Sequence, residues 1–223
     1  MQTAEGCRNY ADLMRGPGMG SVEINDARGP EAFNQLMRLE QESTEIFQVQ
    51  PNFLPGLLQV EGYAASMIGG IAQLAPGATE LTERVGVRMQ RARAFESRLK
   101  GTRPPRLWAV IDEAAVRRVV GGPAVMREQL DHLVAVSKLD TITLAIVPLG
   151  HGAYPGLTGS LEIHQVAEGP AAVFFEGVNG DEIDTDPELV RRHRETVESM
   201  LTSAVTGAEA TALLESISGS LSS

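Results

Sequence analysis

The segment that decides the fold is Leu107-Trp108-Ala109-Val110-Ile111-Asp112-Glu113, five apolar residues followed at once by two carboxylates. A short, unbroken apolar run is typical of a strand that is buried on both faces of a sheet. Residues 141–147, Thr-Ile-Thr-Leu-Ala-Ile-Val, show the alternation of a second strand. Between the two runs, Gly122-Pro123 marks the start of a helix, because proline is favoured at the first helical position. We therefore expect strand, helix and strand in this order.

The chain on both sides of this unit carries the periodicities of further helices and strands. We predict helices over residues 30–42, 61–74, 79–100, 187–205 and 206–217, and strands over residues 46–49, 161–166 and 171–176. Thr79, Asp186 and Thr206 stand where side chains cap helices, and Glu168-Gly169 suits a hairpin turn. This order indicates an α+β (α/β-like) fold, with a small mixed β-sheet flanked by helices and a helical N-terminal part.

Three parts follow from the order of the elements. Residues 1–30 are rich in glycine and polar groups, which predicts an irregular N-terminal arm. Residues 31–103 predict a helical subdomain, and residues 104–223 predict a mixed α/β subdomain. Since no strong linker separates these two subdomains, we expect them to pack as one unit.

The composition excludes several classes of protein. The 223 residues include 29 acidic and 19 basic ones, a net charge of −10, which disfavours binding to nucleic acid by charge alone. One cysteine excludes an internal disulfide. We expect no membrane segment and no secretory signal, and hence a cytoplasmic location. Four scattered histidines, and the lack of a phosphate loop or dinucleotide motif, predict no metal site and no cofactor.

Two groups of candidate site residues follow predicted strands. Asp112 and Glu113 come directly after the first apolar run, where a carboxylate binds a cation or acts as a general base. The alternative is that Asp112 caps the next helix. His151 and Tyr154 lie in the glycine-rich loop after the second strand, where an imidazole and a phenol serve binding. The alternative there is a surface connection whose tyrosine packs on the sheet.

A third candidate is Glu176, which ends the apolar strand over residues 171–176 and needs solvent or a partner. The arginine-rich helix over residues 79–100 offers Arg88 or Arg91 as that partner. The carboxylate is therefore either part of a site or one half of a structural ion pair.

These candidates meet if the strands that end at residues 111, 147 and 175 run parallel. Their loops then leave the same edge of the sheet, where ligands usually bind. The helix over residues 61–74 and the arginine-rich helix form the opposite wall. The predicted ligand-binding residues are Gln59, Tyr63, Arg88, Arg91, Glu113, His151, Tyr154 and Glu176. If the site is catalytic, Glu113, Glu176 and His151 are the candidates for acid–base chemistry.

Four segments of the chain resemble a known family. Residues 55–64, Pro-Gly-Leu-Leu-Gln-Val-Glu-Gly-Tyr-Ala, are close to the family string VPGLLQTEDYA, residues 107–118 to LWVVLDEAALRR, and residues 119–130 to PVGGPEVMREQL. Residues 147–159 are similar to a fourth motif, and Glu176 falls on the family's glutamate after an aliphatic strand. Across residues 33 to 217 the chain resembles the C-terminal domain of unknown function of actinobacterial antitoxin-like helix-turn-helix transcriptional regulators.

This resemblance implies a regulatory role and a small partner protein encoded nearby. Only about 30 residues precede the matched region, too few for a helix-turn-helix domain, so we expect no direct DNA binding. We expect a stand-alone domain that binds a small metabolite or a small partner protein, with a homodimer left open. The alternative is an enzyme of specialised metabolism, in which carboxylates act as acid and base on a cationic or amino-bearing substrate.

Overall fold

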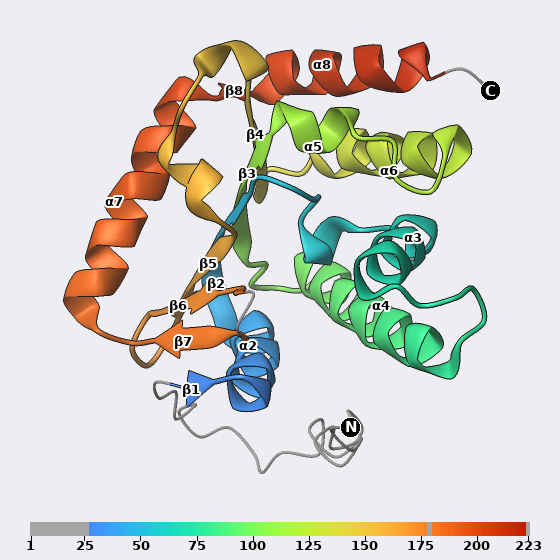
Figure 1. The fold of residues 1–223 in the computed structure, drawn as a ribbon. Coiled ribbons are helices and arrows are strands. Elements are labelled where there is room, and N and C mark those ends of the chain that lie inside the picture. The colour runs from blue at the N-terminus through green and yellow to red at the C-terminus, as the bar shows by residue number, and fades with distance from the viewer. Residues whose placement is uncertain (1–26, 178–179, 222–223) are drawn as a thin grey trace.

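A computed structural model of the protein describes residues 27–177 and 180–221, and it has one mixed sheet with helices on both faces (Figure 1). The eight strands of these residues lie in the order β1-β7-β6-β5-β2-β3-β4-β8. They are Ala27–Arg28 (β1), Ser43–Gln50 (β2), Arg106–Asp112 (β3), Ile142–Val147 (β4), Leu161–Val166 (β5), Ala172–Phe175 (β6), Glu182–Asp184 (β7) and Val205–Thr206 (β8). The α+β prediction is confirmed, although the sheet has more strands than the sequence predicts.

Helices of the same residues cover the sheet. The α-helices are Pro30–Glu42 (α2), Glu61–Ala72 (α3), Thr79–Leu99 (α4), Glu113–Arg117 (α5), Pro123–Val136 (α6), Pro187–Ser203 (α7) and Gly207–Ser220 (α8). Short 3-10 turns lie at Gly56–Leu58 (η1), Leu149–His151 (η2) and Pro155–Thr158 (η3). None of the helices in the described ranges has the length and apolar character needed to cross a membrane.

The directions of the strands bring several chain connections to one edge of the sheet. β2, β3 and β4 run parallel, and β5 lies antiparallel on the other side of β2. β6 is antiparallel to β5, so it runs in the same direction as β2. The carboxyl ends of β2, β3, β4 and β6 therefore share one edge, which we call the carboxyl edge. However, β2 and β5 separate β6 from β3.

The two faces of the sheet have different coverings (Figure 1). α7 packs on one face, over a core that includes Phe47, Val110 and Ile163. We call the opposite side the α4 face; its main core includes Ile46 and Leu107 with side chains of α3, α5, α6 and α8. Successive side chains of a strand point to opposite faces of the sheet, and helices cover both faces. A polar side chain on either face is therefore enclosed where a helix packs over it.

Prolines and one aspartate set three helix starts as the sequence predicts. Pro30, Pro123 and Pro187 are the first residues of α2, α6 and α7. Asp186 caps α7 by accepting a hydrogen bond from the main-chain N–H of Leu189 at 2.7 Å. These starts were predictable because the signals are local.

The expected caps at Thr79 and Thr206 are wrong. Thr79 is already the first residue of α4, and Ala78 precedes it without a side-chain cap. Thr206 precedes α8, but its side chain makes no capping hydrogen bond, and its backbone is extended where β8 pairs with Ala145 of β4. Strand pairing sets the conformation there.

The sheet draws on both predicted subdomains. β2 belongs to the predicted helical part over residues 31–103, yet it lies between β5 and β3 near the middle of the sheet. Most of the predicted N-terminal arm, residues 1–26, lies outside the described residues. β1, β7 and β8 are two or three residues long, too short to show a periodicity in the sequence.

Candidate functional site

A group of charged and amide side chains lies on the α4 face, where β2 and β5 run side by side. Gln48 of β2 pairs in register with Glu162 of β5, and His164 lies two residues further along β5 on the same face. All three side chains are buried. We define the polar cluster as Glu40, Gln48, Arg88, Arg91, Glu162, His164, Glu176 and Asp181. Its residues come from α2, β2, α4 and β5 and from the chain between β6 and β7.

His164 connects the polar cluster to the end of α2. Its Nδ1 lies 3.1 Å from the Ser43 hydroxyl, and its Nε2 lies 3.2 Å from a carboxylate oxygen of Glu162. The Ser43 hydroxyl donates to the carbonyl of Leu39 at 2.6 Å, so we assign the proton of Nδ1 to the contact with Ser43. Because Ser43 is fully buried and its proton is engaged, this Ser–His–Glu chain is not a nucleophilic triad.

Glu162 keeps a low pKa although it is buried. Burial alone would raise the pKa of Glu162, but the hydrogen bond and charge of His164 lower it. The charge of Arg91 and the amide of Gln48 act in the same direction, and the net result lies below the ordinary value. The polar cluster therefore holds a carboxylate charge beneath α4.

Arg91 and Glu40 form a buried ion pair that ties α4 to α2. Nε and Nη2 of Arg91 lie 2.8 and 2.5 Å from the two oxygens of Glu40, and the side chains are 7% and 5% exposed. The guanidinium also lies 5.2 Å from the centre of the Phe33 ring. Arg98 donates to the carbonyls of Glu40 and Ser43, both at 2.6 Å. Arg91 is therefore part of a fixed framework, with both carboxylate oxygens of its partner engaged.

The segment over residues 54–63 holds Arg88 in place. The Tyr63 hydroxyl accepts a hydrogen bond from the N–H of Leu54 at 3.2 Å, and the Gln59 amide donates to the carbonyl of Leu54 at 2.8 Å. The Gln59 oxygen accepts from Nη1 of Arg88 at 3.2 Å. Gly56 leaves the space that the guanidinium occupies, because a Cβ there would stand 2.6 Å from Nη1. Arg88 is thus positioned by a neutral partner, and no carboxylate of the described chain pairs with it.

Gln48 is the anomaly of the site. It is fully buried, and neither its amide nitrogen nor its oxygen has a hydrogen-bond partner of ordinary geometry among the residues that the structure describes, although the amide stands close enough to Glu162 to lower the pKa of that carboxylate. Gln129 is equally buried, but it accepts from the N–H of Val60 and donates to the carbonyl of Leu58, both at 2.8 Å. Buried side-chain amides usually have partners, because an unmet one costs about 1–3 kcal/mol. The unmet amide of Gln48 is therefore the feature of the polar cluster that most needs an explanation.

Glu176 lies where the polar cluster reaches the surface at the carboxyl edge. Its residue is exposed, yet desolvation by the surrounding atoms raises the pKa of its carboxyl, and the charges of Glu162 and Asp181 raise it further. Arg88 acts in the opposite direction. Burial likewise raises the pKa of Asp181. The expected alternative of an ion pair between Glu176 and Arg88 or Arg91 is wrong: the charges influence each other, but neither arginine lies within ion-pair distance of Glu176.

The burial and the charges that act on Glu176 also change the pKa of Arg88. Burial is the main cause that lowers the pKa of Arg88, to about 10, and the charge of Arg91 adds to it. Glu176, Glu40 and Glu162 oppose this shift. Arg88 and Glu176 thus influence one another's charge where the polar cluster reaches the surface, a place that we call its mouth, and neither has an ion-pair partner among the described residues.

Asp112 and Tyr154 form a second group, on the α7 face. Asp112 caps α5 by accepting from the N–H of Ala114 at 2.7 Å, as its alternative interpretation predicted. Its other oxygen accepts from the Tyr154 hydroxyl at 2.9 Å. Burial, followed by the hydrogen bond and charge of Asp112, raises the pKa of Tyr154. Tyr154 therefore packs on the sheet and anchors the loop after β4.

Glu113 fixes the start of the same loop. Its carboxylate accepts from the N–H of Leu149 at 2.8 Å and pairs with Arg117 at 2.6 Å. Burial would raise the pKa of Glu113, but these two partners lower it. His151 is exposed and meets the Tyr154 ring edge-on at 5.9 Å between centres. The carboxylate of Glu113 is engaged in structural contacts.

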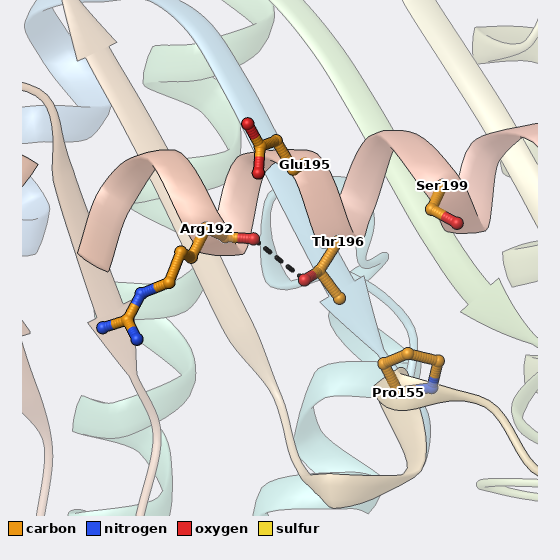
Figure 2. A pocket seen from close by; sticks show the side chains of 5 residues that line it. All are labelled: Pro155, Arg192, Glu195, Thr196 and Ser199. Carbon is orange, nitrogen blue, oxygen red and sulfur yellow. Dashed lines mark hydrogen bonds between the residues drawn. The ribbon is translucent and has the colours of Figure 1, made fainter. Parts of the chain in front are cut away.

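Two hollows of the described surface lie outside the polar cluster, and one of them borders the second group at Pro155, the residue after Tyr154. One, of about 470 Å³, is open to solvent along the outer side of α7, where Arg192, Glu195, Thr196 and Ser199 face Pro155 (Figure 2). Thr196 there donates to the carbonyl of Arg192 within the same helix. The other, of about 270 Å³, lies between β4 and α8 and includes Thr143 and Gly207. The charged side chains that line these hollows are exposed to solvent, and neither hollow includes a predicted site residue.

A family model described as a domain of unknown function, DUF5753, matches residues 33–216. The chain belongs to this family. No curated protein matches the sequence. Among solved structures, the DUF5753 chain is similar to TrmBL2, an archaeal chromatin protein whose structure shows a novel mode of DNA binding, at 13% identity and a TM-score of 0.41. The match covers 88% of this chain and 58% of TrmBL2, so the chain spans less than two thirds of that protein.

The fold of this DUF5753 chain brings half of the predicted residues together. Gln59, Arg88, Arg91 and Glu176 gather at or beside the polar cluster, whereas Glu113, His151 and Tyr154 form the separate loop group. Tyr63 is fully buried, and its hydroxyl serves the turn that holds Arg88. The residues that sequence reasoning missed are Glu40, Gln48, Glu162, His164 and Asp181. Glu162 and His164 alternate with apolar residues in a predicted strand, which is visible in the sequence. Polar residues in this pattern usually face solvent, so the sequence does not show that these two are buried.

Proposed function

We propose that this domain is a regulatory module that binds a small-molecule effector at the mouth of the polar cluster. The observation that carries the proposal is the amide of Gln48, which is fully buried and has no hydrogen-bond partner within the described residues. A group of this kind costs stability in the free protein, and a ligand that supplies a donor and an acceptor removes that cost. Proteins commonly retain such local destabilisation at binding sites.

The position of the cluster supports the same proposal. It lies at the carboxyl edge, beside the boundary between the parallel and antiparallel parts of the sheet, which is where ligands collect in open α/β sheets. Arg88 and Glu176 both lack an ion-pair partner in the described chain and stand at its surface end. A small molecule gives these groups partners without disturbing the buried pair of Arg91 and Glu40.

The regulatory part of the proposal comes from the resemblance to antitoxin-like regulators of actinobacteria. A role without direct DNA contact is in keeping with the net charge of −10. The enzymatic alternative has less support, because the serine of the Ser–His–Glu chain is enclosed and Glu113 is held by Leu149 and Arg117. We therefore propose a cytoplasmic sensor of a metabolite.

The test is native mass spectrometry of the full chain after incubation with a small-molecule extract of its source cells. We expect a bound mass below about 1 kDa on the wild-type protein, lost in Glu176→Gln and kept in Glu215→Gln. Glu215 is exposed on α8 and serves as the matched control. If the wild-type protein retains no mass, or if both variants retain it equally, the proposed function is wrong.

A further inference from the structure

We propose that the effector carries a free α-amino-acid head group, whose carboxylate binds Arg88 and whose ammonium lies between Glu176 and Asp181. This inference rests on the proposed function and names the chemistry of the molecule that the site takes. It follows from the charges that stand unpaired at the mouth of the polar cluster, and from the way that the chain holds each of them.

Arg88 is prepared for a carboxylate. A guanidinium has five N–H donors in a planar fork, and Arg88 uses one of its nitrogens, at 3.2 Å, on the neutral oxygen of Gln59. Gly56 lies directly against Nη1, so the orientation of the fork is set by backbone contact as well as by that bond. A fixed fork with spare donors matches a carboxylate in two parallel hydrogen bonds.

Glu176 and Asp181 are prepared for a cation. Glu176 has no hydrogen bond or ion pair with any residue of the described ranges, and its charge is felt by both Arg88 and Arg91. The main-chain carbonyl of Asp181 accepts a hydrogen bond from the N–H of Gly29 at 2.7 Å. The carboxylate of Asp181 has no hydrogen bond or ion pair with the residues that the structure describes. The charges of Glu162 and Asp181 oppose the ionisation of Glu176, and the charge of Glu162 opposes that of Asp181. An ammonium relieves that repulsion.

A zwitterion suits the site better than a simple anion or cation. An anion on Arg88 alone would lie near the charges of Glu176 and Glu162, whereas a cation on Glu176 alone would lie near those of Arg88 and Arg91. Phe174 pairs with Glu162, and Glu176 follows two residues later, so the two carboxylates share the α4 face of the sheet. The charges of Arg88 and Glu176 influence each other, but the two side chains form no ion pair, so a molecule that carries both charges gives each of them a partner. The unpaired amide of Gln48, next to Glu162, adds one donor and one acceptor for further polar atoms.

The experiment is isothermal titration calorimetry of the full chain with each of the twenty standard α-amino acids. We expect at least one to bind. Its methyl ester, which lacks the carboxylate charge, and its N-acetyl derivative, which lacks the ammonium, should each bind at least about 10-fold more weakly, because each loses charged hydrogen bonds. These comparisons use the wild-type protein, so they do not depend on whether a variant folds.

Two pairs of variants locate the head group. Arg88→Lys keeps the charge but removes the fork, and Glu176→Gln keeps the shape but removes the charge. We expect each to weaken binding at least about 10-fold, while the exposed controls Arg93→Gln on the same helix and Glu215→Gln leave it unchanged.

Three outcomes overturn the inference: no amino acid binds, the ester or the N-acetyl derivative binds as well as its parent, or the control variants weaken binding as much as Arg88→Lys and Glu176→Gln. If mass spectrometry still shows a bound small molecule that is lost in Glu176→Gln, only the amino-acid head group is wrong and the proposed function stands. If no small molecule is retained in either experiment, both fail.

Discussion

Replacing Gln48 by methionine should make the free protein more stable. Methionine has nearly the same length and no polar atoms, so it fills the same space without the unmet donor and acceptor. An unsatisfied buried polar group costs about 1–3 kcal/mol. Because the amide of Gln48 still favours the Glu162 carboxylate, we take the lower part of that range. The expected gain is about 1–2 kcal/mol, or about 2–8 °C in Tm for a chain of this size.

The matched control for this prediction is Gln129→Met. Gln129 is equally buried, but both ends of its amide are hydrogen-bonded to main-chain groups of residues 58 and 60. Its replacement leaves those main-chain groups without hydrogen-bond partners and should destabilise the protein by about 1–3 kcal/mol. Urea unfolding followed by circular dichroism measures both changes, and titration with the effector tests whether Gln48→Met also weakens binding. The reasoning is refuted if Gln48→Met destabilises the protein as much as Gln129→Met does.

Further predictions concern the framework and the second group. Glu40→Gln should cost about 3–5 kcal/mol in urea unfolding, because it leaves Arg91 buried without its ion-pair partner; a loss under about 1 kcal/mol would contradict this. The raised pKa of Glu176 means that its ionisation opposes folding at neutral pH, so Glu176→Gln should be more stable than wild type at pH 7 and equal to it below about pH 4. Glu162 has a lowered pKa, so its contribution is present above its ordinary value of 4.5 and is lost as the pH falls through its folded pKa; Glu162→Gln should remove that acid-side loss from the stability curve. Tyr154→Phe should lower stability by about 1–2 kcal/mol, since Asp112 loses a hydrogen bond, and should leave effector binding unchanged in calorimetry.

The elements that the sequence predicts are those with a local signal. The apolar run over residues 107–111 is β3, and prolines 30, 123 and 187 mark helix starts. β7 and β8 have no such signal, because a strand of two or three residues is defined by its neighbour in the sheet. The same holds for the expected cap at Thr206, where pairing of β8 with β4 outweighs a local preference.

The candidate site was predictable only in part, because strand order and face are properties of the whole sheet. The charge of Arg88 influences the carboxyl of Glu176, as expected if the arginine-rich helix lies opposite the end of that strand. Glu113 does not join them, since β2 and β5 intervene between β3 and β6. Glu162 and His164 alternate with apolar residues in β5 and look solvent-facing in sequence; the helices that cover them come from residues 30–99, far away in the chain.

The buried pair of Arg91 and Glu40 has a mechanical consequence. α4 carries both Arg88 at the mouth and Arg91 one turn deeper, and Glu40 belongs to α2, which follows β1 at the outermost edge of the sheet (Figure 1). A ligand that displaces Arg88 therefore also acts on α2, because α4 carries Arg88 and is joined to α2 by the ion pair of Arg91 and Glu40. That ion pair connects a ligand bound at Arg88 with α2, and through α2 with β1 at the outer edge of the sheet.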